Sequence, residues 1–143
     1  LLISDHVLFK PAKLTKEERE YMKSHTTKGC EIMKMMKNVQ TPEYFKKSME
    51  ICRYHHERYD GRGYPEGLKG DEIPIAAQIV SVVDAYHALI SERVYKRAYS
   101  KEDAYYMVLG GECGIFSPKV MECFRMSRKE METIGTVECA ETA

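Results

Sequence analysis

The side chains of this chain that could carry out chemistry are three histidines and one aspartate, and they are widely separated in the sequence. They are His25, the adjacent pair His55 and His56, and Asp84. Neutral imidazole rings bind divalent transition metals, and a carboxylate beside them suits iron, manganese or zinc. Neighbouring residues differ by about 100° around a helix, so the pair can face one cleft only where a helix ends. The spacing is not a local metal motif, and each histidine could instead satisfy a separate group.

Asp84 is the sharper signal because its neighbours in the sequence are apolar. Val82, Val83 and Ala85 surround it. A carboxylate buried without a partner costs several kcal/mol of desolvation, so a partner is required. A metal ion is one candidate, and a buried basic side chain such as Arg93 is the alternative.

A glycine-rich segment begins at the histidine pair and has the sequence HHERYDGRGYP, residues 55–65. Gly61 and Gly63 permit special backbone conformations, and Tyr64 can stack or form a hydrogen bond. The glycine spacing matches neither a P-loop nor a dinucleotide-binding loop, so it is a weak phosphate signal.

A basic cluster lies downstream of Asp84. Arg93, Lys96 and Arg97 follow it by roughly three helical turns. Such cations can bind phosphate groups, and a solvated surface cluster is the other interpretation.

The elements that must position these residues are all predicted to be helices. Helical signals run along almost the whole chain, and no segment alternates like a half-buried strand, so the sequence predicts an all-α fold. The residues from Asp60 to Ile73 are rich in glycine and proline, which predicts a structured loop. The segment 75–90 is apolar nearly all round and predicts the central buried helix. Cap and proline signals predict helices from Thr15 to about Lys23, Thr26 to Lys37, Pro42 towards His56, Pro74 onwards, Ser100 to Gly110, and Ser117 to about Met131.

The composition is that of one small domain of 143 residues with one core. The 22 basic and 22 acidic residues balance, which argues against a nucleic-acid polymer or an anionic membrane surface as partner. The five cysteines are odd in number and never form CxxC, so we expect reduced thiols and a cytoplasmic location. No apolar run approaches the roughly 20 residues that span a bilayer.

Together these segments resemble one known family. HHERYDGRGYP is similar to the signature loop of the HD-GYP family, and GLKGDEIP and IVSVVDAYHALISERVYKRA follow at the family's spacing. The upstream DHVLFKPAKLTKEEREYMKSHTTKG resembles the segment between the family's first catalytic motif and its next metal-ligand histidine. The resemblance covers about residues 3–125. It implies an HD-superfamily helical bundle, a two- or three-metal site, and hydrolysis of cyclic dimeric GMP to the linear dinucleotide or GMP.

The resemblance also implies roles for individual residues. It implies that the metal ligands are His25, His55, His56 and Asp84, of which the last three are also catalytic. It implies that the substrate-binding residues are Gly63, Tyr64, Pro65, Arg93 and Lys96. We expect the four metal-ligand side chains to converge in one cleft. The metals would be divalent transition metals, with iron or manganese favoured.

One departure from the family is large, because the His-Asp dyad that names the superfamily is absent from the chain. We expect it, with an aspartate that bridges two metals, a few residues before Leu1. The segment 1–132 would then be the C-terminal portion of the domain, 133–143 a frayed tail, and the isolated chain inactive. The alternatives are a catalytically silent module that docks a signalling protein through its GYP loop, and a hydrolase of another nucleotide. An incomplete bundle would also expose apolar surface and favour a homo-oligomer.

Overall fold

The computed structural model describes residues 3–35, 41–92 and 97–133, and within these ranges every regular element is a helix. The prediction of an all-α fold is therefore confirmed. The predicted tail, apart from Thr133, lies outside the described residues, as do Arg93 and Lys96. The helices are α1 (Asp5–Leu8), α2 (Lys16–Lys23), α3 (His25–Met35), α4 (Pro42–Tyr54), the short 3-10 helix η1 (Gly70–Glu72), α5 (Ile75–Ile90), α6 (Lys101–Leu109), α7 (Pro118–Met126) and α8 (Arg128–Thr133).

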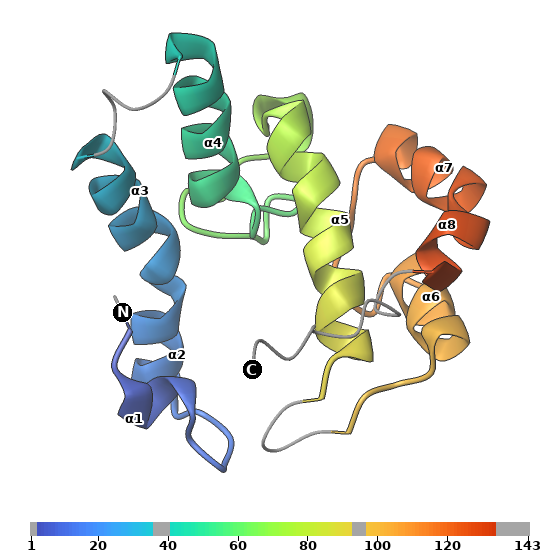
Figure 1. Cartoon of the computed structure of the whole chain (residues 1–143), viewed down its shortest axis with the longest axis horizontal. Helices are drawn as coiled ribbons and strands as arrows, with labels where there is room; N and C mark the ends of the chain where they lie inside the picture. Colours follow the sequence, from blue (N-terminus) through green and yellow to red (C-terminus); the bar gives the residue numbers. More distant parts are fainter. Residues whose placement is uncertain (1–2, 36–40, 93–96, 134–143) are drawn as a thin grey trace, which may run out of the picture.

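The helices surround α5, which runs through the middle of the molecule (Figure 1). On one side α2 and α3 follow one another almost without a bend, because Ser24 between them keeps a helical conformation. Helix α4 packs between α3 and α5, and α6 and α7 pack on α5 from the other side. This order brings the start of α3 and the end of α4 next to the loop that connects α4 to α5.

Three of the predicted helix starts are fixed in the structure by local hydrogen bonds from the capping side chain. Thr15 and Glu18 form a reciprocal capping box at the start of α2. The side chains of Thr41 and Ser100 each accept a backbone N–H from the first turn of α4 and α6. These side chains satisfy backbone donors that a helix start leaves unpaired.

The main apolar core lies where α5 meets α6, α7 and α8. Tyr86 of α5 and Tyr105 of α6 both contact the ring of Phe124, at centroid distances of 6.0 and 5.2 Å. The hydroxyl of Tyr86 donates to the carbonyl of Met131 at 3.3 Å. This core holds the C-terminal half of α5, so it fixes the orientation of the helix that carries Asp84.

Two predictions about the helices are wrong in part. The segment from Ser117 to Met131 is not one helix, because the chain turns at Ser127 and α8 brings the buried Met131 onto Tyr86. Tertiary packing here overrides the local helical pattern.

Helix α5 is also not buried on all sides. Ile75, Ile79 and Val83 are 48, 50 and 41% exposed, and with α7 and α8 they line an apolar groove of about 260 Å³. In the described part of the chain, no helix is long and apolar enough to cross a membrane.

Candidate metal centre

The structure brings the three predicted histidines into one cluster. His25 is the first residue of α3, His55 caps the end of α4, and His56 follows in the turn. Each offers one ring nitrogen, and these nitrogens all lie within 4.8 Å of one another. Because the helix has already ended at Tyr54, the adjacent residues His55 and His56 can face the same point, as the sequence analysis required.

Hydrogen bonds to the backbone orient two of these rings. Nδ1 of His25 lies 2.9 Å from the carbonyl oxygen of Met22, and Nδ1 of His55 lies 2.9 Å from that of Ile51. A carbonyl only accepts, so each Nδ1 carries the proton and donates it. A neutral ring that carries its proton on Nδ1 presents its Nε2 lone pair, which is the usual arrangement of a metal-ligating histidine.

The two Nε2 atoms face each other at 3.3 Å. With both protons on Nδ1, neither Nε2 can donate to the other, so two lone pairs converge on one point. A cation between them removes this repulsion. The donor set therefore fits a divalent metal ion, held by His25, His55 and His56.

His56 is kept neutral by its surroundings. Burial, together with smaller contributions from the positive charges that His55, His25 and Arg58 can carry, lowers its pKa to about 3. At neutral pH one of its two ring nitrogens therefore remains unprotonated and available as a metal ligand. The ring also stacks on Tyr64, with centroids 4.7 Å apart and planes 28° apart.

Asp84 is not part of this cluster. The half-buried carboxylate, in the middle of α5, is not among the groups within 4.8 Å of one another. Its negative charge opposes loss of the proton from Tyr64 and favours the charged form of Arg58. The structure thus brings three of the four predicted ligands together and places Asp84 near Tyr64 and Arg58. Arg93, its alternative partner, lies outside the described residues.

The loop between α4 and α5 carries Tyr64 to the histidines. Its left-handed positions are glycines, with φ of 80° at Gly61 and 70° at Gly67. Gly63 lies so close to the backbone of residues 57–58 that a Cβ atom there would clash. The N–H of Tyr64 donates to the carbonyl of His56 at 3.2 Å. Burial raises the pKa of Tyr64 to about 12, so its hydroxyl stays protonated and can donate a hydrogen bond.

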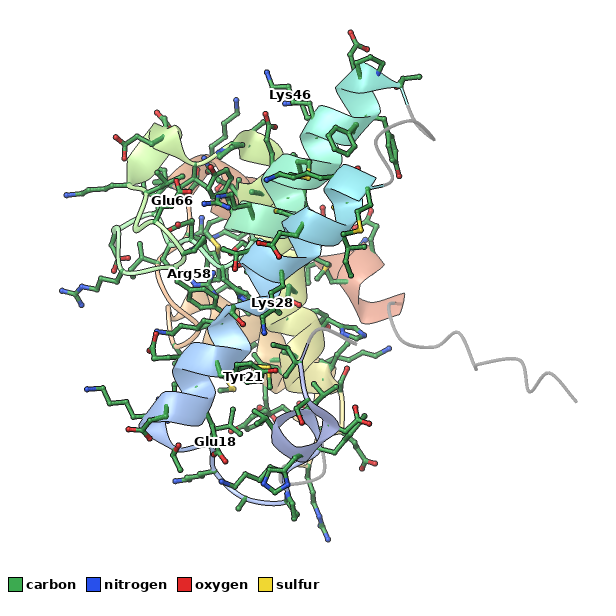
Figure 2. The ribbon with its side chains drawn as sticks, turned by 90° about the vertical axis from the view of Figure 1, so that its left-hand side faces the viewer. Glu18, Tyr21, Lys28, Lys46, Arg58 and Glu66 are labelled. Carbon is green, nitrogen blue, oxygen red and sulfur yellow. The ribbon has the colours of Figure 1, made fainter. Side chains whose placement is uncertain are left out.

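Arg58 is a residue that the sequence reasoning missed. Its Nη1 donates to the Ser81 hydroxyl at 2.7 Å, and its Nε donates to the Cys113 carbonyl at 3.2 Å. Burial lowers its pKa, and the charge of Asp84 acts in the opposite direction. Arg58 thus joins the loop to α5 and to the segment before α7. Figure 2 labels Arg58 and Glu66, both on this loop. The only sign of this role in the sequence was the presence of a charged residue, Arg58, within the glycine-rich motif.

Lys23 was missed as well. Its Nζ lies 5.4 Å from the ring centroid of Tyr64, and it pairs with Glu20 at 2.7 Å. It stands two residues before His25, in the last turn of α2. Its closeness to Tyr64 depends on packing between distant segments, so the sequence carried no sign of it.

The fold and the site together define an all-helical domain with a candidate metal centre of three histidines. A family model described as the HD domain matches residues 6–110. The chain therefore belongs to the HD domain family.

Curated relatives agree with this assignment. The chain is 40% identical over 132 residues to a cyclic di-GMP phosphodiesterase of Thermotoga maritima, with 92% of this chain and 35% of the relative covered. It is 37% identical over 134 residues to a cyclic di-GMP phosphodiesterase response regulator of Xanthomonas campestris, with 94 and 34% covered. It is 35% identical over 120 residues to a 3'3'-cGAMP-specific phosphodiesterase of Vibrio cholerae, with 84 and 22% covered. These names confirm the resemblance to the HD-GYP family, and the chain spans about a third or less of the length of these relatives.

Proposed function

We propose that this chain is the C-terminal, metal-binding portion of a phosphodiesterase domain that hydrolyses cyclic dimeric GMP to the linear dinucleotide or GMP. The observation that carries the proposal is that the Nε2 atoms of His25 and His55 lie 3.3 Å apart, with a ring nitrogen of His56 beside them. The names of the relatives support the substrate class. A cytoplasmic location, where thiols stay reduced, stays a prediction of the composition.

Divalent metal ions, two or three in the complete domain and most simply iron or manganese, would supply the charge that activates water and stabilises the phosphoryl oxygens. His25, His55 and His56 would hold mainly one ion. Asp84, whose charge acts on Tyr64 and Arg58, would serve another. The backbone carbonyls of Met22 and Ile51 would keep two of the rings in the tautomer that the ion needs.

The remaining proposed residues act on the substrate. Tyr64 would donate a hydrogen bond or stack on a guanine, with Gly63 and Pro65 shaping its loop. Arg93 and Lys96 would neutralise a phosphate, as the family resemblance implies. We also propose that the exposed side of this loop contacts a signalling protein and that the exposed stripe of α5 supports a homo-oligomer.

The test uses the complete protein, purified with manganese or iron and incubated with cyclic dimeric GMP. We expect linear dinucleotide or GMP to appear by chromatography, and the His55→Ala variant to lose metal and turnover together. Because one relative is named for 3'3'-cGAMP, this dinucleotide is the matched second substrate. Faster turnover of 3'3'-cGAMP would reassign the substrate. Bound metal with no turnover of either dinucleotide would favour the silent docking module.

A further inference from the structure

Glu57 is a carboxylate buried at the centre of the signature loop. It follows His56 directly, and its side chain is only 2% exposed. Burying a carboxylate is costly unless hydrogen bonds compensate for the lost water. One of its oxygens, Oε1, receives two of these bonds, while Oε2 has no partner among the described residues.

The two donors to Oε1 lie just after the Gly63-Tyr64-Pro65 tripeptide. The backbone N–H of Glu66 donates at 2.7 Å and that of Gly67 at 3.1 Å. At the start of the tripeptide, Gly63 lies directly against the backbone of residues 57–58. Within it, the N–H of Tyr64 donates to the carbonyl of His56. Hydrogen bonds and close packing therefore hold the tripeptide against His56 and Glu57, the two residues that follow His55.

We infer that Glu57 is a positioning residue, which holds Tyr64 over His56 through the backbone of the loop. With Oε1 in place, the loop returns to the end of α4 and the Tyr64 ring stacks on the imidazole. Without this acceptor, the two part-buried N–H groups lose their partner, and the loop is free to move away from the end of α4 so that they bind water instead. This inference rests on the proposed function for the part Tyr64 plays with substrate.

The central test compares Glu57→Ala with Glu57→Gln in the complete, metal-loaded protein. Glutamine keeps an acceptor oxygen, so we expect Glu57→Gln to retain a KM for cyclic dimeric GMP within about threefold of the parent value. Glu57→Ala should raise KM by roughly ten- to hundredfold, since a displaced group loses its geometry, and should keep its metal. A folded Glu57→Gln variant without activity would overturn the inference, because the acceptor alone would then be insufficient. Loss of metal by Glu57→Ala would overturn it too.

Glu66→Ala is the matched control. The Glu66 side chain pairs with Arg53 at 2.6 Å on the exposed side of the same loop, while its backbone N–H keeps its bond to Glu57. We expect an unchanged KM from this variant. A rise equal to that of Glu57→Ala would show that any weakening of the loop has the same effect, and would overturn a specific role for Glu57.

A double-mutant cycle shows whether Glu57 acts through Tyr64. If it does, Glu57→Ala should add less than about twofold to KM once Tyr64 is already alanine, because coupled residues are not additive. Full additivity would overturn the inference. Hydrogen exchange of the Glu66 and Gly67 amides gives a readout that needs no substrate, and it should accelerate in Glu57→Ala only. Unchanged exchange would refute the anchor even in an active enzyme, whereas faster exchange in a protein that does not hydrolyse the dinucleotide would leave the anchor standing and refute only the proposed function.

Discussion

At the residue scale, the candidate metal site depends on the tautomers of the histidine rings, because a proton on Nδ1 leaves Nε2 free to bind a metal ion. His25 and His55 each give up one nitrogen to a backbone carbonyl and present the other to the same point. The sequence predicted the residue types and their meeting at a helix end. It could not predict the tautomers, because they depend on where the carbonyls of the preceding turn point. The role of Glu57 escaped prediction because it depends on how the loop folds back on itself, and that of Arg58 because Ser81 and Cys113 are distant in the sequence.

His56 should make the stability of the metal-free protein depend on pH. Its pKa is held at about 3 in the folded chain, against 6.5 for an unperturbed histidine. Between these values the unfolded chain binds a proton at this position and the folded chain does not. The free energy of unfolding should therefore fall as the pH drops from about 7 to about 5. Urea unfolding at the two pH values should show a smaller fall for His56→Asn, and an equal fall would contradict the assignment.

Removal of the Asp84 side chain and removal of the Arg93 side chain should have different effects on the metal content, kcat and KM of the complete protein. Asp84→Ala removes a proposed metal ligand, so kcat should drop on the order of a thousandfold or more and part of the bound metal should be lost. Because Asp84 stands outside the three-histidine group, the metal held by the histidines should remain. Arg93→Ala should keep all metal and raise KM roughly ten- to hundredfold. Metal analysis and steady-state kinetics on the same samples separate the two. If Asp84→Ala keeps its full metal content, Asp84 is not a ligand.

At the element scale, the packing of α3 on α4 sets the distance between the histidines. The two helices come unusually close at Gly29, where a Cβ atom would lie 2.6 Å from the sulfur of Cys52. Burial raises the pKa of Cys52 to about 11, with a further contribution from Cys30, so this thiol is an inert part of the interface. A glycine in the middle of a helix is therefore explained here by the approach of a neighbouring helix.

This close approach predicts a coupling between the two positions. Alanine should stabilise the helix by about 1 kcal/mol relative to Gly29, but its methyl group would collide with Cys52. We therefore expect Gly29→Ala to be more favourable by about 1–3 kcal/mol when Cys52 is also alanine than when it is not. Denaturant unfolding of the four proteins in the cycle measures this difference. Additive effects would mean that Cys52 simply rotates away.

Helix starts were predictable at this scale, whereas helix surroundings were not. Thr15, Thr41 and Ser100 mark helix starts because each forms its hydrogen bond within its own first turn. The turn at Ser127 and the exposed stripe of α5 depend on how helices pack, and a local pattern carries no information about that. An apolar segment was thus read correctly as a helix and wrongly as one buried on every side.

At the scale of the whole molecule, the exposed stripe of α5 is an apolar surface that a second protein chain could cover. Ile75, Ile79 and Val83 are spaced one turn apart beside the groove formed with α7 and α8. Apolar patches of this kind favour association. We predict that the 143-residue chain self-associates and that Ile79→Lys weakens this without unfolding it. Sedimentation velocity over a range of concentrations tests it, with Met126→Lys, at an exposed residue not lining the groove, as control.

The positions of His25 and His55 have a consequence for how the molecule holds together. They are thirty residues apart in sequence, so an ion bound to both would act as a removable cross-link between α3 and α4. Such a link adds its binding free energy to the stability of that interface, while the core of α5 to α8 lies outside the closed segment. Chelation should therefore loosen one half of the molecule before the other. The hydrogen-exchange rates of backbone amides should rise first in α3 and α4. The mobility of these two helices would then report whether the metal is bound.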